Sequence, residues 1–250
     1  EETIAILSGL KTRFEEHHGV SYDPEALIAK AQEVGAKLIY FANPDNPMGS
    51  WHDAATVQRM IAALPEGCVL CLDEAYGEFA PAGTLPPLDT SHPRVIRMRT
   101  FSKAYGMAGA RVGYAIAHAD FATAFNKVRN HFGMSRIGQA GALAALSDQD
   151  WLAHVVAQVA EGRAQIGQMV RAVGFEPLPS ATNFVTVDCG AGAERAKAVL
   201  DSLVGGGIFI RMPFVAPQNR CVRISVGTKR ELKQLQVEIQ TLASTFTNHL

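Results

Sequence analysis

The sequence predicts an α/β fold: a large domain built on a mostly parallel sheet, followed by a small α+β domain. Three observations carry this prediction. Apolar runs of strand length alternate with helical patterns up to residue 174, as in parallel sheets that are covered by helices. Hydrophobic residues make up 48% of the 250 residues, which is enough for a buried core. Glycine and proline break the pattern at 174–179 and indicate a domain boundary.

The first three helices are expected from their apolar spacing and their ends. Residues 3–18 carry apolar side chains at helical intervals and are followed by Gly19, a residue typical of helix C-caps. A second helix follows Asp23, which suits an N-cap, and has Pro24 in its first turn. A third helix is expected over 53–64.

Strands are expected where short apolar runs are bounded by turn residues. In the large domain these runs are 37–41, 68–72, 95–98 and 113–116, and they are followed by long helical stretches at 119–146 and 150–173. In the small domain we expect strands at 183–187, 208–211 and 222–226, with helices at 191–204 and 229–248. The two domains are therefore predicted over 1–174 and 175–250.

Charge and hydropathy exclude several classes of partner. The chain has 23 basic and 24 acidic side chains and a net charge of -1, so it lacks the basic excess that binds nucleic acid or an anionic membrane. No apolar run is long enough to cross a membrane as a helix. We expect small molecules or another folded chain as partners. Four cysteines are too few for a disulfide scaffold and no secretory signal is visible, which predicts a cytoplasmic location.

Cysteine and histidine spacing gives no reason to expect a metal site. Cys68 and Cys71 have the spacing of a redox or zinc motif, but they lie inside an apolar run and no second pair accompanies them. The histidines form no cluster with the spacing of metal ligands. We interpret the two cysteines as structural thiols.

Polar residues follow three of the predicted strands. The chain reads Ala-Asn-Pro-Asp-Asn-Pro-Met-Gly at 42–49, Asp-Glu-Ala-Tyr at 73–76 and Arg-Thr-Phe-Ser-Lys at 99–103. Ligands of parallel α/β sheets bind beyond the carboxyl ends of the strands. Taken singly, these segments are compatible with a turn, a strand-end carboxylate and a solvated lysine. Their convergence at one edge predicts a binding site.

In order along the chain, these motifs and a late Arg-Ile-Ser-x-Gly-Thr at 223–228 resemble the fold-type I pyridoxal-phosphate aminotransferases, and among them the histidinol-phosphate aminotransferase branch. The resemblance covers most of the chain. It implies a three-layer large domain and pyridoxal 5'-phosphate as the cofactor.

The resemblance assigns the cofactor residues. Lys103 resembles the lysine that binds the cofactor as a Schiff base and then moves protons. Asp73 resembles the carboxylate that keeps the ring nitrogen protonated, the state in which the cofactor withdraws electrons. Tyr76 and Asn46 resemble the pair that hydrogen-bonds the phenolic oxygen. The cofactor phosphate is assigned to Thr100, Ser102 and Arg111.

The substrate residues follow in the same way. Arg223 resembles the arginine that binds the substrate α-carboxylate, and Asn183 stands where the family has a residue near that carboxylate. Arg211 is a candidate for a second anionic group such as a phosphate, and a solvated strand-end arginine is an equal alternative.

The resemblance implies transfer of an amino group from a donor such as histidinol phosphate or an aromatic amino acid to a 2-oxo acid such as 2-oxoglutarate. It also implies a homodimer with shared active sites. Two alternatives stay open: a pyridoxal-phosphate decarboxylase or lyase of the same fold, and a catalytically silent relative that binds a partner.

The sequence departs from the family pattern at three places. Near 20–21 the family has a strand, a glycine-rich turn for the cofactor phosphate and a stacking aromatic residue, and we expect that several dozen residues are missing between Val20 and Ser21. Met48 replaces the usual threonine and is expected to alter local capping only. Gly133 and Ser135 replace two asparagines near the expected substrate pocket, which bears on the choice of substrate.

Overall fold

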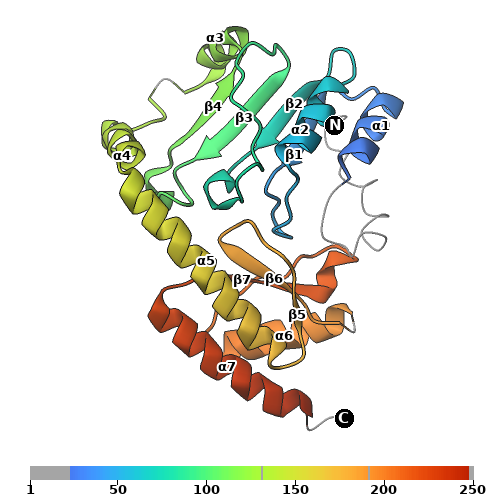
Figure 1. Ribbon diagram of the computed structural model, residues 1–250, viewed down its shortest axis with the longest axis vertical. Coiled ribbons are helices and arrows are strands. Elements are labelled where there is room, and N and C mark those ends of the chain that lie inside the picture. The colour runs from blue at the N-terminus through green and yellow to red at the C-terminus, as the bar shows by residue number, and fades with distance from the viewer. Residues whose placement is uncertain (1–22, 131, 191, 248–250) are drawn as a thin grey trace. The chain divides into compact units, whose positions relative to one another are not determined.

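The computed structural model describes residues 23–130, 132–190 and 192–247 (Figure 1). The helix expected over 3–18 and the gap expected near 20–21 lie outside these residues. The described residues fold into two compact units: 23–44 with 51–156, and 45–50 with 157–247. The chain therefore enters the second unit for six residues and returns to the first, before it enters the second again within a long helix.

The first unit alternates helices and strands as expected. Its elements are α1 (Pro24–Glu33), β1 (Leu38–Ala42), α2 (Ala54–Ala62), β2 (Val69–Asp73), η3 (Gly77–Phe79), β3 (Val95–Thr100), η4 (Ala108–Ala110), β4 (Gly113–Ala117), α3 (Ala119–Val128), α4 (Arg136–Ser147) and the first part of α5 (Gln149–Arg171). The predicted strands and the helices at 24 and 54 are confirmed to within a few residues.

The sheet of the first unit has the strand order β1-β2-β3-β4. Strands β1, β2 and β3 run parallel, and β4 pairs antiparallel with β3, so the expectation of a mostly parallel sheet is confirmed. In register, Ala42 pairs with Asp73, and Thr100 pairs with Gly113. The carboxyl ends of three strands and the start of the fourth consequently lie at one edge of the sheet.

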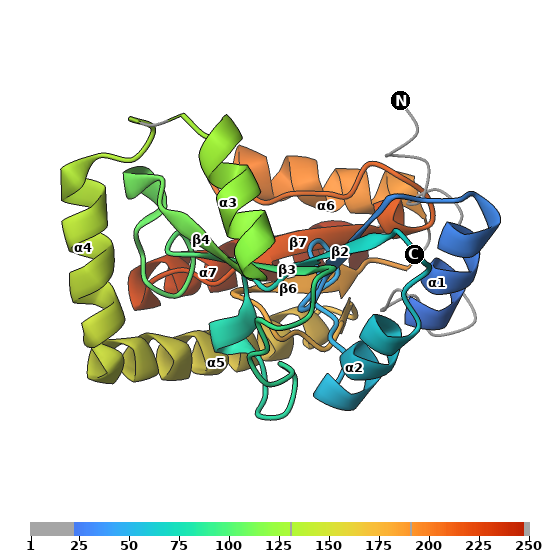
Figure 2. The ribbon, with the colours of Figure 1, turned by 90° about the horizontal axis from the view of Figure 1, so that it is seen from above.

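The core of this unit lies between the sheet and the first two helices. Apolar side chains of α1, α2, β1 and β2 form one cluster, and Ile39, Leu70 and Leu72 within it are fully buried. Figures 1 and 2 show α1 and α2 beside the β1 end of the sheet and α4 beyond its β4 end. The N-terminus of α1 is fixed by Asp23, whose Oδ1 accepts the N–H groups of Glu25 and Ala26 at 2.9 and 3.2 Å.

The prediction of one helical stretch over 119–146 is wrong. The chain leaves α3 after Val128 and begins α4 after Ser135. Two polar side chains bind the backbone in the break: Asn130 Oδ1 accepts the N–H of Phe132 at 3.0 Å, and Ser135 Oγ accepts the N–H of Gly138 at 3.0 Å. Such local bonds compete with the helical ladder, so they end one helix and cap the next.

The second unit is a three-stranded antiparallel sheet with helices. Its elements are the rest of α5, β5 (Glu176–Pro177), β6 (Phe184–Asp188), α6 (Ala193–Gly205), η5 (Gln218–Arg220), β7 (Cys221–Ser225) and α7 (Lys229–Thr247), with strand order β5-β6-β7. The cluster at its centre draws buried side chains from α5, β6, α6, β7 and α7. The predicted small α+β domain is present in this form.

Two details of the second unit differ from expectation. The run 208–211 is apolar enough for a strand, but only Arg211 bridges to β7, through paired backbone bonds with Arg223 at 3.1 and 2.6 Å. The helix α5 contributes Ile166 and Val170 to the core of this unit, with exposures of 0 and 2%. The unit therefore begins inside α5, upstream of the predicted boundary at 174, and the functional division into domains stays a prediction.

Among the described residues, no helix has the length and apolar character needed to cross a membrane.

Candidate active site

The edge of the first sheet gathers six of the residues singled out in the sequence. Asp73 ends β2 and Tyr76 lies in the turn that follows it. Thr100 ends β3, and the chain continues through Ser102 and Lys103. Arg111 lies two residues before β4, whose first residue pairs with Thr100. The parallel register brings these positions together although they span 39 residues of sequence.

Asp73 is half-buried and held in place by backbone and side-chain bonds. Its Oδ1 accepts the N–H of Ala75 at 2.9 Å, and its Oδ2 accepts the hydroxyl of Tyr40 from β1. Its carbonyl accepts the N–H of Asn43 at 2.9 Å. Within the described part of the chain, no lysine, arginine or histidine forms an ion pair with this carboxylate. Its negative charge is thus available to a cationic group of a ligand.

Lys103 lies over the face of a buried tyrosine. Its Nζ is 5.1 Å from the ring centroid of Tyr76, a distance at which the ring attracts a cation. In the region that the structure resolves in detail, no carboxylate pairs with this amine. The segment turns sharply here, since Thr100 Oγ1 accepts the N–H of Ser102 at 3.0 Å and the Lys103 carbonyl accepts that of Gly106 at 2.9 Å. An amine without a carboxylate partner can react with a carbonyl compound.

Arg111 has an unusual backbone. Its φ and ψ are 54° and 48°, and it is the one non-glycine residue with positive φ among those the structure describes. The left-handed region costs a residue with a Cβ about 1–2 kcal/mol. Its side chain is exposed, donates to the Ala108 carbonyl at 2.8 Å and has no acidic partner in the described chain. Strained residues of this kind cluster at functional sites.

The Asn-Pro loop carries the first of four candidate residues in the second unit. Arg223 donates from Nη1 to Asn46 Oδ1. The predicted pairing of Asn46 with Tyr76 joins residues of different units and stays a prediction. Arg211 and Arg223 both line a pocket of about 290 Å³, together with Pro47, Phe214 and neighbouring residues. Two guanidinium groups in one pocket favour an anionic ligand.

Asn183, the fourth candidate in this unit, precedes β6 and is half-buried. Its carbonyl accepts the N–H of Val226 at 2.9 Å. This bond extends the pairing of β6 with β7 by one residue beyond Phe184 and Ser225. Its backbone is therefore fixed beside the strand that carries Arg223.

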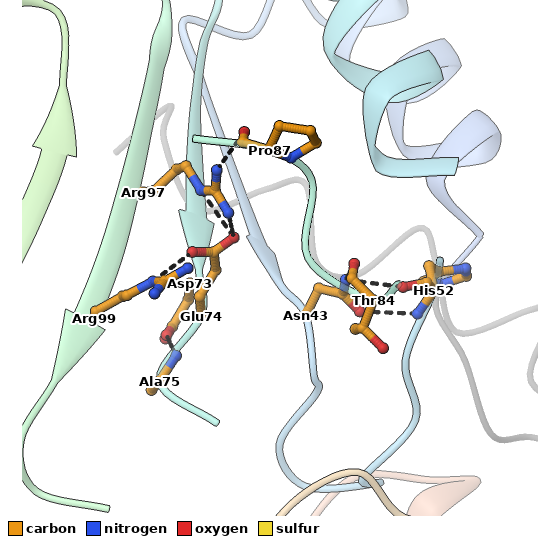
Figure 3. Close-up of polar contacts among 9 residues, drawn as sticks. All are labelled: Asn43, His52, Asp73, Glu74, Ala75, Thr84, Pro87, Arg97 and Arg99. Atoms are coloured by element: carbon orange, nitrogen blue, oxygen red, sulfur yellow. Dashed lines mark hydrogen bonds and ion pairs between the residues drawn. The ribbon is translucent and has the colours of Figure 1, made fainter. Parts of the chain in front are cut away.

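The Asn-Pro loop has separate contacts in each of the two units. In the first unit Asn43 binds the backbone of His52 in both directions, at 3.1 Å to its carbonyl and 2.9 Å from its N–H (Figure 3). In the second, Met48 is 2% exposed and packs against Cys221 and Leu178. The expectation that Met48 affects local capping only is therefore wrong, because its side chain anchors the loop in a core.

Asp45 is the buried acid of this loop. It is 3% exposed, and its Oδ2 accepts the N–H of Met48 at 3.0 Å. Burial raises its pKa from 3.8 to about 7, against the opposing effect of the backbone bonds.

Sequence reasoning missed two groups around Asp73. Tyr40 binds its carboxylate, and Glu74 is fully buried against Arg97 and Arg99 of β3. Two signals were available in the sequence. Tyr40 places a hydroxyl inside an apolar strand, and Arg97 and Arg99 stand at alternate positions of another strand. Among the described residues, histidine, cysteine, aspartate and glutamate form no group of three that could hold a metal ion.

Comparison with known proteins gives consistent matches. The family described as "Aminotransferase class I and II" matches residues 4–239. "Histidinol-phosphate aminotransferase 1" of Nitrosococcus oceani is 35% identical over 231 residues, which cover 91% of this chain and 61% of that protein. "Histidinol-phosphate aminotransferase 2" of Pseudomonas aeruginosa is 37% identical over 213 residues, which cover 84% and 57%.

Solved structures agree with this comparison. The crystal structure of histidinol-phosphate aminotransferase from Sinorhizobium meliloti in complex with pyridoxal-5'-phosphate has a TM-score of 0.86 and 53% identity, and the match covers 88% of this chain and 62% of that one. A decarboxylase from Sulfurospirillum multivorans shares the fold, with a TM-score of 0.75 and 20% identity. The chain spans about three fifths of the length of the two curated relatives and of the Sinorhizobium structure.

We expect Asp45→Asn to remove a pH dependence of stability. Folded Asp45 keeps its proton up to about pH 7, whereas the unfolded chain releases it near 3.8. The folded state therefore binds more protons between these values, and its free energy of unfolding falls as the pH rises through this window. Denaturant unfolding at pH 5 and pH 8 should show the variant gaining stability relative to wild type at pH 8, by a few kcal/mol at roughly 1.4 kcal/mol per pKa unit.

Asp53→Asn is the matched control for this measurement. Its hydrogen bonds to Thr56 lower the pKa of Asp53, so its charge stabilises the folded state above the ordinary pKa. The asparagine variant should gain nothing at pH 8. An Asp45→Asn variant whose stability relative to wild type is the same at both pH values would contradict the buried-acid interpretation.

Proposed function

We propose that this chain, which belongs to the class I and II aminotransferase family, binds pyridoxal 5'-phosphate and transfers an amino group from an amino donor to a 2-oxo acid. Histidinol phosphate or an aromatic amino acid is the proposed donor, and 2-oxoglutarate a proposed acceptor. The similarity to histidinol-phosphate aminotransferases, at 35% and 53% identity in the two comparisons, supports this choice.

The observation that carries the proposal is the placement of Lys103 over Tyr76 at the sheet edge where Asp73 also lies. The edge combines, among the described residues, a lysine amine without a carboxylate partner, a carboxylate without a cationic partner and, at Arg111, a guanidinium without an acidic one. Pyridoxal phosphate has an aldehyde, a basic ring nitrogen and a phosphate. The residues present therefore fit this cofactor.

Each cofactor residue then has a role that follows from its chemistry. Asp73 holds a proton on the ring nitrogen, and the hydroxyl of Tyr40 and the Ala75 N–H keep its carboxylate in place. Tyr76 donates to the phenolic oxygen together with Asn46. When bound, the cofactor supplies an electron sink for charge that develops on the substrate carbon.

Lys103 and the phosphate ligands complete the first unit's share of the site. Lys103 would hold the cofactor through its aldehyde, and its amine, once released, would act as the general base that moves a proton at the substrate carbon. Thr100, Ser102 and Arg111 would bind the phosphate, because a guanidinium and hydroxyl groups are donors suited to its oxygens.

The second unit supplies the substrate residues in this proposal. Arg223 binds the α-carboxylate or the anionic group that replaces it, Arg211 binds a second anion, and Asn183 lies near the substrate carboxylate. The pocket that both arginines line supports this assignment.

A homodimer in the cytoplasm completes the proposal. Helix α4 carries no charged residue after Arg136, and it exposes Ile137 and Leu143 by 87 and 69%. Exposed apolar side chains of this kind are typical of a surface that another chain covers, and a surface that meets its own copy closes a dimer. The four cysteines are all free thiols, which suits a reducing compartment.

Lys103→Ala tests the central role. Wild type mixed with pyridoxal phosphate should develop a visible absorption band, and borohydride reduction should fix the cofactor on the peptide that contains Lys103, as mass spectrometry would show. The variant should develop neither, while Lys197→Ala, a surface lysine paired with Asp201, should behave as wild type. A covalent label on the alanine variant would remove Lys103 from its role.

The same preparation separates the reactions. Candidate amino donors should bleach the band and 2-oxoglutarate should restore it. Release of carbon dioxide without a bleached band would instead favour a decarboxylase, and a wild type without any band would favour a silent relative.

Arg111→Gly should raise stability and lower cofactor affinity at once. Glycine removes the left-handed strain, so the free energy of unfolding without cofactor should rise by up to ~1 kcal/mol. Loss of the guanidinium should raise the dissociation constant of pyridoxal phosphate at least about tenfold. Arg111→Ala, which keeps the strain, should lose affinity without the gain in stability. Unchanged affinity in both variants would contradict a phosphate ligand here.

The double substitution of Ile137 and Leu143 by aspartate should convert a dimer to a monomer, as light scattering would show, because two charges then face the apolar interface. Val237→Asp on α7, at a residue 58% exposed, is the control and should leave the mass unchanged. A wild type that is monomeric at all concentrations would contradict the proposed dimer.

A further inference from the structure

Glu74, the residue after Asp73, is a fully buried acid held by two arginines. Its Oε1 accepts Nε and Nη2 of Arg97 at 2.9 and 2.5 Å, and its Oε2 accepts Nε of Arg99 at 2.9 Å. Figure 3 shows both arginines converging on this carboxylate from β3. Arg97 is itself 2% exposed and donates from Nη1 to the Pro87 carbonyl at 2.8 Å.

This triad is a costly way to hold two strands together. Taking charges out of water costs more than a hydrophobic contact of the same size, so a buried ion pair is weak evidence for a role in stability alone. Glu74 and Arg97 are buried, with side-chain exposures of 0 and 3%, whereas the Arg99 side chain is 19% exposed. A better attested use of buried ion pairs is to specify one geometry of the chain. Removing one member of such a pair leaves an unpaired buried charge, so alternative arrangements are disfavoured.

The geometry that the triad fixes is that of the candidate site. Glu74 continues β2 by one bond, its N–H to the Met98 carbonyl at 2.9 Å, and its own carbonyl accepts the N–H of Gly77 at 2.9 Å. The turn that carries Tyr76 is thus built on the backbone of Glu74. On the other side, Arg99 directly precedes Thr100 in β3, and Arg97 lies two residues before Arg99.

We propose that Glu74 is a positioning residue that locks the end of β2, with Asp73 and Tyr76, to the end of β3, which leads to Lys103. The inference rests on the proposed function. Successive side chains of a strand point to opposite faces, so Glu74 and the arginines lie on the face away from Asp73 and leave its carboxylate accessible. The residue acts through backbone placement and does not touch the cofactor.

Glutamate meets this requirement where glutamine does not. A carboxylate offers two acceptor oxygens, one for each arginine, whereas the amide of glutamine replaces one of them by a donor that faces a guanidinium. Glu74→Gln should therefore break the interaction with one of the two arginines while it keeps the volume of the side chain. Arg99→Gln removes the ion pair between Arg99 and Glu74 and leaves the neutral pair of Glu74 with Arg97.

Hydrogen exchange of the full-length protein without cofactor tests the lock directly. In both variants, amides of 74–77 and of 101–106 should exchange several-fold faster together, while those of β1 and β7 stay as in wild type. Asp188→Asn breaks a partly exposed ion pair of the second unit, with Arg220 at 2.7 Å, and is the control that should leave both segments unchanged.

Cofactor binding gives the second readout. Both variants should shift the absorption maximum of bound pyridoxal phosphate and raise its dissociation constant roughly tenfold, the effect of one lost charge-assisted hydrogen bond. Asp188→Asn should change neither quantity. A merely stabilising ion pair would lower the unfolding temperature of all three variants and move neither the spectrum nor the exchange of 101–106.

The outcomes separate the two proposals. Exchange of 101–106 at the wild-type rate in Arg99→Gln overturns the inference, whether or not cofactor binds. Faster exchange in the variants of a protein whose wild type develops no visible band supports the lock and contradicts the proposed function instead. If Glu74→Gln does not fold, as its circular dichroism would show, Arg99→Gln decides alone.

Discussion

Parallel pairing of β1, β2 and β3 is the constraint on which the candidate site depends. Because the three strands point the same way and stay in register, the residues that follow them must emerge at one edge. Asp73 and Lys103 lie at that edge as a result of topology, although they are 30 residues apart in the sequence. Arg111 lies at the same edge because β4 begins there, with Gly113 paired to Thr100 at the end of β3. Each strand by itself would supply only an isolated polar side chain.

The sequence predicts this arrangement well where one local rule decides the structure. Alternation of apolar runs and helices predicted the sheet, and Asp23 followed by Pro24 marked the start of α1. The sequence-based prediction was wrong where tertiary context decides the structure. The run 208–211 has the composition of a strand, yet within it only Arg211 forms a β-bridge, with Arg223. The break between α3 and α4 depends on side-chain bonds of Asn130 and Ser135, which compete with a helix that composition favours.

The sequence predicted the residues of the site better than the neighbouring residues that hold them in place. Motifs identified Asp73, Lys103 and Arg111, because reactive groups stand at fixed places relative to strand ends. The supports, such as Tyr40 and Glu74, lie on neighbouring strands, and their roles depend on which strands pair and in which register. That information is not local to any motif. The positive φ of Arg111 is likewise set by the turn into β4 and has no signature in its residue type.

The six-residue excursion at 45–50 has a consequence for how the protein can be divided. Thr186 of β6 donates to the Pro47 carbonyl at 2.5 Å, and Met48 fills part of the hydrophobic interior beside Cys221. A contiguous piece from 157 onward would contain Thr186 and Cys221 but lack their partners Pro47 and Met48, so it would not contain the whole second unit. A protease that nicks α5 would also leave the halves tethered through the Asn-Pro segment. The second unit is therefore discontinuous in sequence, because residues 45–50 belong to it as well as the residues from 157 onward.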